Sequence, residues 1–136
     1  MSTRRWLLLS TIPAAAAAGI GAWVLRTFDP NLPGNPFPAC LFHQLTGFYC
    51  LGCGTTRALH ALVHGDIATA LRMNALVLAL MALLPFTVAW QGGWRPALLQ
   101  PIARWLGTPW PWAVGLPAYW IARNLPWFPF TLLAPG

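Results

Sequence analysis

The sequence predicts an all-α membrane protein with about three transmembrane helices and a short interfacial helix that follows a cysteine-rich loop. Of its 136 residues, 57% are hydrophobic and 7% are charged, whereas an average soluble domain carries roughly 25% charged residues. The mean hydropathy is +0.57. The chain also has 9 Trp and 14 Pro, which is typical of aromatic belts and interrupted helices at a bilayer boundary. These observations favour a small integral membrane protein of one domain.

Three apolar runs, each bounded by arginines, are the expected spans. Their lengths are close to the roughly 20 residues that cross about 30 Å of hydrocarbon. The third run contains prolines, and an internal proline deletes a helical hydrogen bond. We therefore expect its helix to begin at Pro109 or Pro111, where proline is tolerated, with Pro117 as a candidate kink. The three expected spans are residues 6–25, 73–94 and 105–122.

The first apolar run has a competing interpretation as a secretion signal. Arg4 and Arg5 precede it, loosely as in a twin-arginine signal, and its alanines could supply a cleavage site. The run exceeds the roughly 7 to 15 residues of a signal core, so a retained anchor is favoured. The chain then divides into an N-terminal transmembrane helix (1–28), a Pro/Cys-rich loop (29–53), and a region (54–136) with the interfacial helix, two transmembrane helices and an apolar C-terminal tail.

The charge of the chain indicates membrane topology rather than nucleic-acid binding. The net charge of +6 comes from 8 arginines, no lysine and 2 aspartates, and most arginines stand singly instead of forming a basic patch. Three spans divide the arginines evenly between the two sides, so the pair directly before the first helix decides the orientation. We expect a cytoplasmic N-terminus and an outside cysteine loop. The expected partners are the lipid bilayer and other membrane proteins or a second copy, with no nucleic acid.

Every cysteine and histidine of the chain lies between Cys40 and His64. The prolines of residues 29–38 exclude a helix and predict an extended linker into this stretch. From Thr55 the residues favour a short helix that continues to about His64, where Gly65 ends it. Core packing does not require such a concentration of reactive side chains. We therefore expect the chemistry of the protein in this stretch.

Spacing places four polar side chains on one face of that short helix, Cys53, Arg57, His60 and His64. They share one stripe at 3.6 residues per turn. In one interpretation the stripe is catalytic: the helix N-terminus and Arg57 lower the pKa of Cys53, which acts as a nucleophile with His60 or His64 as the base. In the other, the stripe is the solvated face of an amphipathic interfacial helix.

The cysteines also allow two other kinds of chemistry. In the first, Cys40-x-x-His43 and Cys50-x-x-Cys53 supply the four ligands of a tetrahedral zinc site, as in a zinc knuckle. In the second, Cys50 and Cys53 form a redox pair or a disulfide, which leaves Cys40 as the odd thiol. The sequence alone leaves zinc, redox and nucleophilic chemistry open.

A longer pattern extends from this stretch almost to the end of the chain: Cys40, Thr46-Gly47, Cys50-Leu51-Gly-Cys53-Gly54-Thr-Thr-Arg57, Gly65-Asp66, Asn74 and Arg123-Asn124-Leu-Pro126. This pattern resembles the domain-of-unknown-function family 2752, small bacterial membrane proteins with a cysteine, then Thr-Gly, then Cys-Pro-x-Cys-Gly-x-Thr-Arg. Leu51 stands where the family has proline, which relaxes the turn without removing a thiol. The family does not require histidine at position 43. The resemblance implies a multi-pass protein of the bacterial inner membrane. It favours a site of three thiols with Arg57 over a four-ligand zinc site that includes His43.

Polar residues beside the expected spans have predicted structural roles. Asn74 begins the second span, while Arg123 and Asn124 follow the third. Such side chains face a bundle interior and here would brace the cysteine loop, or, for Arg123, snorkel to the interface. Asp66 should cap the next helix through Thr69.

Three classes of function fit the sequence. The first is a membrane module with a thiol- or metal-type site, which predicts bound metal. The second is a cysteine-dependent membrane enzyme, which predicts selective alkylation of one thiol and intact folding of a Cys53→Ser variant. The third is an accessory subunit of a larger membrane assembly, which suits the small size and the many aromatic residues.

Overall fold

The computed structural model describes residues 3–135, with side chains from residue 12 onward. Within these residues it contains helices and no strands, which confirms the all-α prediction. The elements, in chain order, are α1 (Thr3–Thr27), α2 (Leu41–Thr46), α3 (Thr55–Val63), α4 (Ile67–Gln91), the 3-10 helix η1 (Ala97–Leu99), α5 (Gln100–Leu106), α6 (Trp110–Ala122) and the 3-10 helix η2 (Phe130–Leu133).

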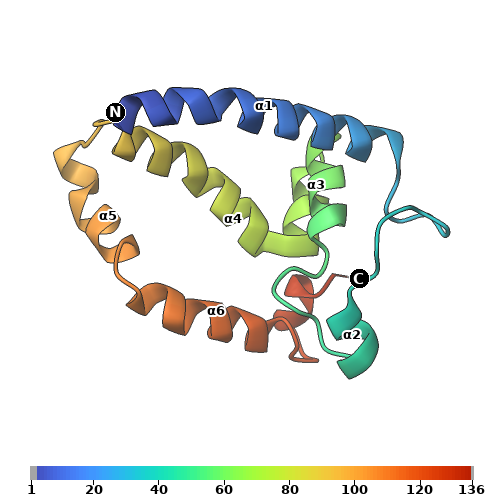
Figure 1. Ribbon diagram of the computed structural model, residues 1–136. Helices are drawn as coiled ribbons and strands as arrows, with labels where there is room; N and C mark the ends of the chain where they lie inside the picture. The colour runs from blue at the N-terminus through green and yellow to red at the C-terminus, as the bar shows by residue number, and fades with distance from the viewer. Residues whose placement is uncertain (1–2, 136) are drawn as a thin grey trace.

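Three helices, α1, α4 and α6, run between two ends of the molecule (Figure 1). They alternate in direction, because α5 returns the chain at one end and the segment from α2 to α3 returns it at the other. We call these ends the far end and the cysteine end. The short elements α2, α3 and η2 all lie at the cysteine end, together with the C-terminus.

Small side chains let α3 pack between α1 and α4. Ala58 and Ala61 are the buried residues of α3, and Ala70 of α4 is fully buried. Arg26 at the end of α1 caps α3, because its Nη2 donates to the carbonyl oxygen of Val63 over 3.1 Å. A buried core of small residues holds the cysteine end together with few large apolar side chains.

The helix α4 starts as the sequence predicts and then breaks. The Asp66 carboxylate accepts a hydrogen bond of 2.9 Å from the Thr69 backbone N–H, which confirms the predicted cap and lowers the pKa of Asp66. One turn later Asn74 leaves helical geometry, with φ −161° and ψ 89°. The helix resumes and ends at Gln91, three residues short of the predicted end of the span. The predicted short helix is confirmed as α3, and Gly65 follows it with φ +82°.

Within the described residues, α4 is the helix long and apolar enough to cross a membrane. Only 11% of its most apolar window is buried inside the molecule, so most of its apolar surface is exposed. The apolar part of α1 with described side chains, Ile12–Thr27, is shorter. The helix α6 begins directly after Pro109, as expected, but its 13 residues rise only about 20 Å. Three transmembrane helices are therefore not confirmed.

Candidate functional site

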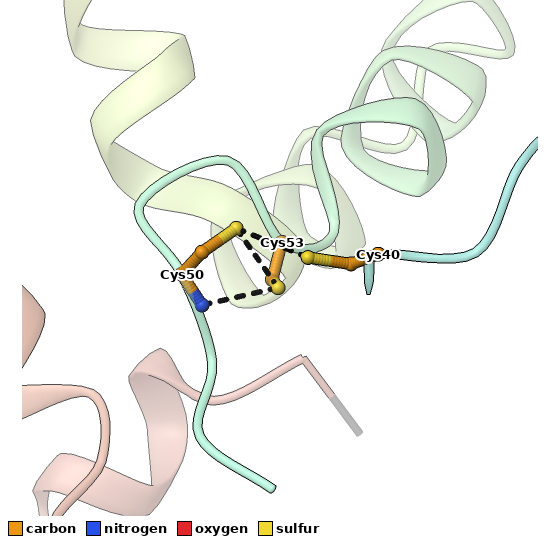
Figure 2. A group of neighbouring side chains, drawn as sticks. All are labelled: Cys40, Cys50 and Cys53. Atoms are coloured by element: carbon orange, nitrogen blue, oxygen red, sulfur yellow. Dashed lines mark hydrogen bonds between the residues drawn. The ribbon is translucent and has the colours of Figure 1, made fainter. Parts of the chain in front are cut away.

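The three cysteine side chains converge at the cysteine end (Figure 2). The Sγ atoms of Cys40 and Cys50 are 3.4 Å apart, those of Cys50 and Cys53 are 3.1 Å apart, and all three lie within 4.8 Å of one another. All three are free thiols. Cys53 is only 6% exposed, whereas the other two are half-buried. Positions ten and three residues apart in the chain thus form one compact sulfur cluster.

Two features of the chain turn it back to bring the thiols together. Cys40 precedes α2, and Gly47 ends that helix in the left-handed region with φ +74°, where its N–H donates to the His43 carbonyl oxygen over 2.8 Å. The next turn brings the N–H of Cys53 to within 3.2 Å of the Cys50 carbonyl oxygen. The Thr46-Gly47 pair therefore serves to reverse the chain between the first cysteine and the second.

Gly54 is required by a close approach of two backbones. Its φ is +80°, and a Cβ atom at this position would lie 2.5 Å from the carbonyl oxygen of Met73 and 2.9 Å from Cβ of Pro135. No side chain larger than hydrogen fits there without movement of the backbone. The loop after Cys53 therefore rests directly on α4, next to the break at Asn74.

Arg123 is buried under the cysteine loop, with 1% of its surface exposed. Its Nη1 donates to the carbonyl oxygens of Cys50 and Leu51, at 3.0 and 3.2 Å. Its Nη2 donates to the carbonyl oxygens of Cys53 and Met73, at 2.9 and 3.4 Å. One guanidinium group thus binds the loop and the end of the first part of α4 together.

Asn74 also contacts the cysteine loop and is fully buried. Its side-chain amide donates to the carbonyl oxygens of Leu51 and Cys53, at 2.9 and 3.2 Å, and to the Thr55 hydroxyl at 3.3 Å. The Tyr119 hydroxyl donates to its Oδ1 over 3.4 Å. The break in α4 falls at the residue whose side chain binds the loop.

Asn124 pairs with the backbone just before the second cysteine. Its Oδ1 accepts from the Tyr49 N–H over 2.7 Å, and its Nδ2 donates to the Tyr49 carbonyl oxygen over 3.0 Å. The Trp120 indole donates to the same carbonyl oxygen over 2.8 Å. The structure therefore places Asn74, Arg123 and Asn124 against the loop that the sequence predicts they brace.

The environment of the thiols shifts two of their pKa values in opposite directions. Burial, and then hydrogen bonds from the neighbouring thiols, raise the pKa of Cys53 to about 12. The backbone N–H of His43, and then the neighbouring thiols, lower the pKa of Cys40. The expectation that a helix N-terminus and Arg57 lower the pKa of Cys53 is therefore wrong, because the largest influence on this thiol is its burial, which raises the pKa.

A cavity of about 420 Å³ borders the sulfur cluster, and its wall includes Cys40, Cys53, His43 and Arg57. Neither aspartate of the chain lines it. The His43 Nδ1 atom is buried and has no hydrogen-bond partner, while the ring stacks on Tyr49 with centroids 4.6 Å apart. His43 does not join the three thiols in the group of ligand atoms within 4.8 Å.

The predicted stripe on α3 divides into two parts. Cys53 and Arg57 line the cavity, whereas His60 and His64 do not. The His60 Nδ1 donates to the Leu25 carbonyl oxygen over 2.7 Å, and its Nε2 lies 3.7 Å from a carboxylate oxygen of Asp29. His64 contacts His60, with ring centroids 4.4 Å apart. The two histidines therefore belong to the junction between α3 and the end of α1.

Sequence reasoning missed Tyr49, Tyr119, Trp120 and Pro135. Tyr49 could have been found from its place directly before Cys50. Tyr119 and Trp120 belong to α6, which is apolar on all sides, so the sequence pattern does not show which residues they contact. Pro135 is buried and lines the cavity, whereas the sequence indicates only that the C-terminal tail is apolar. This position of Pro135 depends on a long-range contact, which no local sequence pattern indicates.

Residues 40–88 match the model of a family described as protein of unknown function (DUF2752). This match confirms the resemblance for the segment that contains all three cysteines, Arg57 and Asn74. It ends within α4 and does not extend to Arg123 and Asn124. No curated protein and no solved structure matches the chain.

Proposed function

We propose that the cysteine loop is a metal centre in which Cys40, Cys50 and Cys53 bind one divalent thiophilic cation, of which zinc is the best candidate. The observation that carries the proposal is the convergence of three sulfur atoms within 4.8 Å. Thiolates at about 2.3 Å from a tetrahedral zinc ion lie roughly 3.8 Å from one another. A disulfide would use two of the sulfurs and leave the third without a role.

The electrostatics of the cluster support a cation as its partner. Burial, and then hydrogen bonds with the neighbouring thiols, keep the proton on Cys53 and raise its pKa to about 12. A divalent cation replaces the protons and offsets two of the three thiolate charges, so binding releases protons and strengthens as the pH rises. The bracing of the loop by Arg123 and Asn74 supports the same function, because it holds the thiols in place at little cost in chain entropy.

The geometry favours this metal centre over a cysteine nucleophile. A reactive cysteine needs a lowered pKa and access to its substrate, whereas Cys53 is 6% exposed and its pKa is raised. The histidine that would serve as its base, His60, donates to the Leu25 carbonyl oxygen at the junction with α1. An accessory role in a larger membrane assembly is compatible with a metal centre of this kind.

We propose further that this centre lies at one face of the bacterial inner membrane. The exposed apolar surface of α4 supports one span, and the alternating directions of α1, α4 and α6 support three (Figure 1), with local thinning of the bilayer around the shorter α6. The N-terminus is then cytoplasmic and the cysteine loop outside. Alkaline phosphatase fused after residue 136 should be active in this arrangement, and an inactive fusion would contradict it.

The metal proposal is tested by counting metal and thiols in the same detergent-purified sample. We expect one zinc per chain and no thiol that reacts before a chelator is added. Cys50→Ser should lose the metal. His64→Gln should keep it, because His64 does not line the cavity. A metal-free protein with three reactive thiols would overturn the proposal.

A further inference from the structure

The cavity beside the thiols gives a ligand access to the proposed metal. Its volume of about 420 Å³ far exceeds the roughly 30 Å³ that one water molecule occupies and lies in the range of small-molecule sites. Cys40 and Cys53 form part of its wall. Three protein thiolates leave the fourth position of a tetrahedral ion open, as in catalytic rather than structural zinc sites. The fourth ligand can therefore enter from this cavity.

The side chains that line the cavity favour an anion. Arg57 contributes a guanidinium group, which is charged at every relevant pH. The two aspartates of the chain, Asp29 and Asp66, are absent from the wall. Within the described residues, no carboxylate side chain therefore lies in the wall to compete with an anionic ligand for Arg57.

A buried polar atom in the same wall lacks a partner. The Nδ1 atom of His43 is buried and unpaired, and an unsatisfied buried polar group costs about 1 to 3 kcal/mol. The stacking on Tyr49, with rings 9° from parallel and centroids 4.6 Å apart, fixes the ring. Because Nδ1 has almost no accessible surface, a ligand in the cavity that bonds to it and removes this cost must displace the atoms that cover it.

From this geometry we infer that the cavity binds a small carboxylate anion that occupies the fourth coordination position of the metal. One carboxylate oxygen coordinates the ion, and Arg57 and the His43 Nδ1–H bind the carboxylate. The inference rests on the proposed metal centre and adds the class of its ligand. It also assigns His43 to the ligand rather than to the metal, which is consistent with its absence from the cluster of ligand atoms within 4.8 Å.

The test uses the full chain in detergent with cobalt(II) in place of zinc, because the visible bands of cobalt report its ligands. Sodium acetate is the probe. We expect a saturable change in the cobalt spectrum of the wild-type protein. Arg57→Gln should weaken acetate binding about 10-fold or more, as expected for loss of a charged hydrogen-bond donor. Arg72→Gln removes an exposed arginine of α4 and should leave the acetate affinity unchanged.

His43→Ala separates the two possible roles of this residue. We expect the cobalt spectrum without acetate to match that of the wild type and the acetate affinity to fall. A change in the acetate-free spectrum would show that His43 is the fourth metal ligand and would overturn the inference. A cobalt-loaded wild-type protein that does not respond to acetate would also overturn it. Failure to bind cobalt at all would instead refute the metal centre, and the anion site with it.

Discussion

The cysteine end and the far end of the molecule are stabilised by different interactions. At the cysteine end, Arg123 and Asn74 are almost completely buried and bind the backbone of one loop. At the far end, Leu98 is 85% exposed and Trp105 is 62% exposed, and within the described residues the short helix α5 packs mainly against η1 and α6. Polar hydrogen bonds fix one end, while the other presents exposed apolar side chains.

This difference shows where the structural specificity of the chain lies. Apolar side chains gain little by packing on one another when lipid tails are equally apolar. Buried hydrogen bonds are directional, and leaving them unmade is costly. The precise position of the three thiols therefore depends on a few polar residues rather than on a large core. Substitutions at the cysteine end should therefore change stability and metal binding more than matched substitutions elsewhere.

Replacement of Arg123 should have the largest effect. Arg123→Met removes a charged donor from four carbonyl oxygens, of which those of Leu51 and Cys53 keep Asn74 as a donor. We expect a loss of about 3 kcal/mol or more in the free energy of unfolding. Metal binding should be lost as well. The matched change Arg104→Met, at an exposed position of the far end, should leave both unchanged. Thermal melting in detergent and metal analysis measure the two effects. Equal melting temperatures of the Arg123→Met and Arg104→Met variants would contradict the expected difference between the two ends.

A pair of glycines separates steric contact from backbone strain. Gly54 and Gly65 have nearly the same φ, +80° and +82°, but a Cβ atom would clash only at Gly54. Gly65→Ala should cost about 1 to 2 kcal/mol from the left-handed conformation, and Gly54→Ala about 1 to 3 kcal/mol more from overpacking. Denaturant unfolding in detergent measures the difference. Similar losses in the two variants would mean that the loop does not rest on α4.

The metal-free protein should lose stability at alkaline pH. The pKa of Cys53 is raised from an ordinary value of 9.0 to about 12 in the folded state, so the unfolded chain releases this proton first as the pH rises. The contribution is complete below pH 9 and is lost as the pH rises toward 12. Cys53→Ala should remove this decline. Unfolding curves with chelator at several pH values measure it, and a stability that rises above pH 9 would contradict the assignment.

The smallest effect is expected at the cap of α4. Asp66→Ala removes the hydrogen bond from the Thr69 N–H and should lower the free energy of unfolding less than the changes above, because the capping side chain is exposed and water can replace it. The metal content should not change. Zinc analysis and thermal melting of this variant check both statements. A loss of metal here would show that the cysteine end depends on α4 as a whole rather than on its buried polar residues.

Much of the fold could be predicted because it follows from local sequence signals. The helix α3, its end at Gly65 and the cap at Asp66 each depend on residues within one or two turns. The convergence of the three cysteines was one of the alternatives that the sequence left open, and the family resemblance favoured it. The predicted spans were less accurate, because hydropathy does not show that α4 breaks at Asn74 or that α6 has only 13 residues.

The parts of the site that could not be predicted depend on contacts between distant residues. The bonds from Arg123 to the cysteine loop span about 70 residues of the chain, and Pro135 returns to the cavity from the tail. Contacts between distant residues also explain why Cys53 and His60 do not form the predicted pair of nucleophile and base. Helical spacing places them on one stripe, but burial raises the pKa of the thiol, and the end of α1 binds the histidine.

X-ray absorption at the zinc edge of the purified protein tests the central claim most directly. The method counts the sulfur atoms bound to the metal and gives their distance. The account predicts three sulfur ligands at about 2.3 Å from the three clustered cysteines. A zinc ion bound by nitrogen and oxygen atoms alone would contradict it, as would sulfur bound in a disulfide with no metal in the sample.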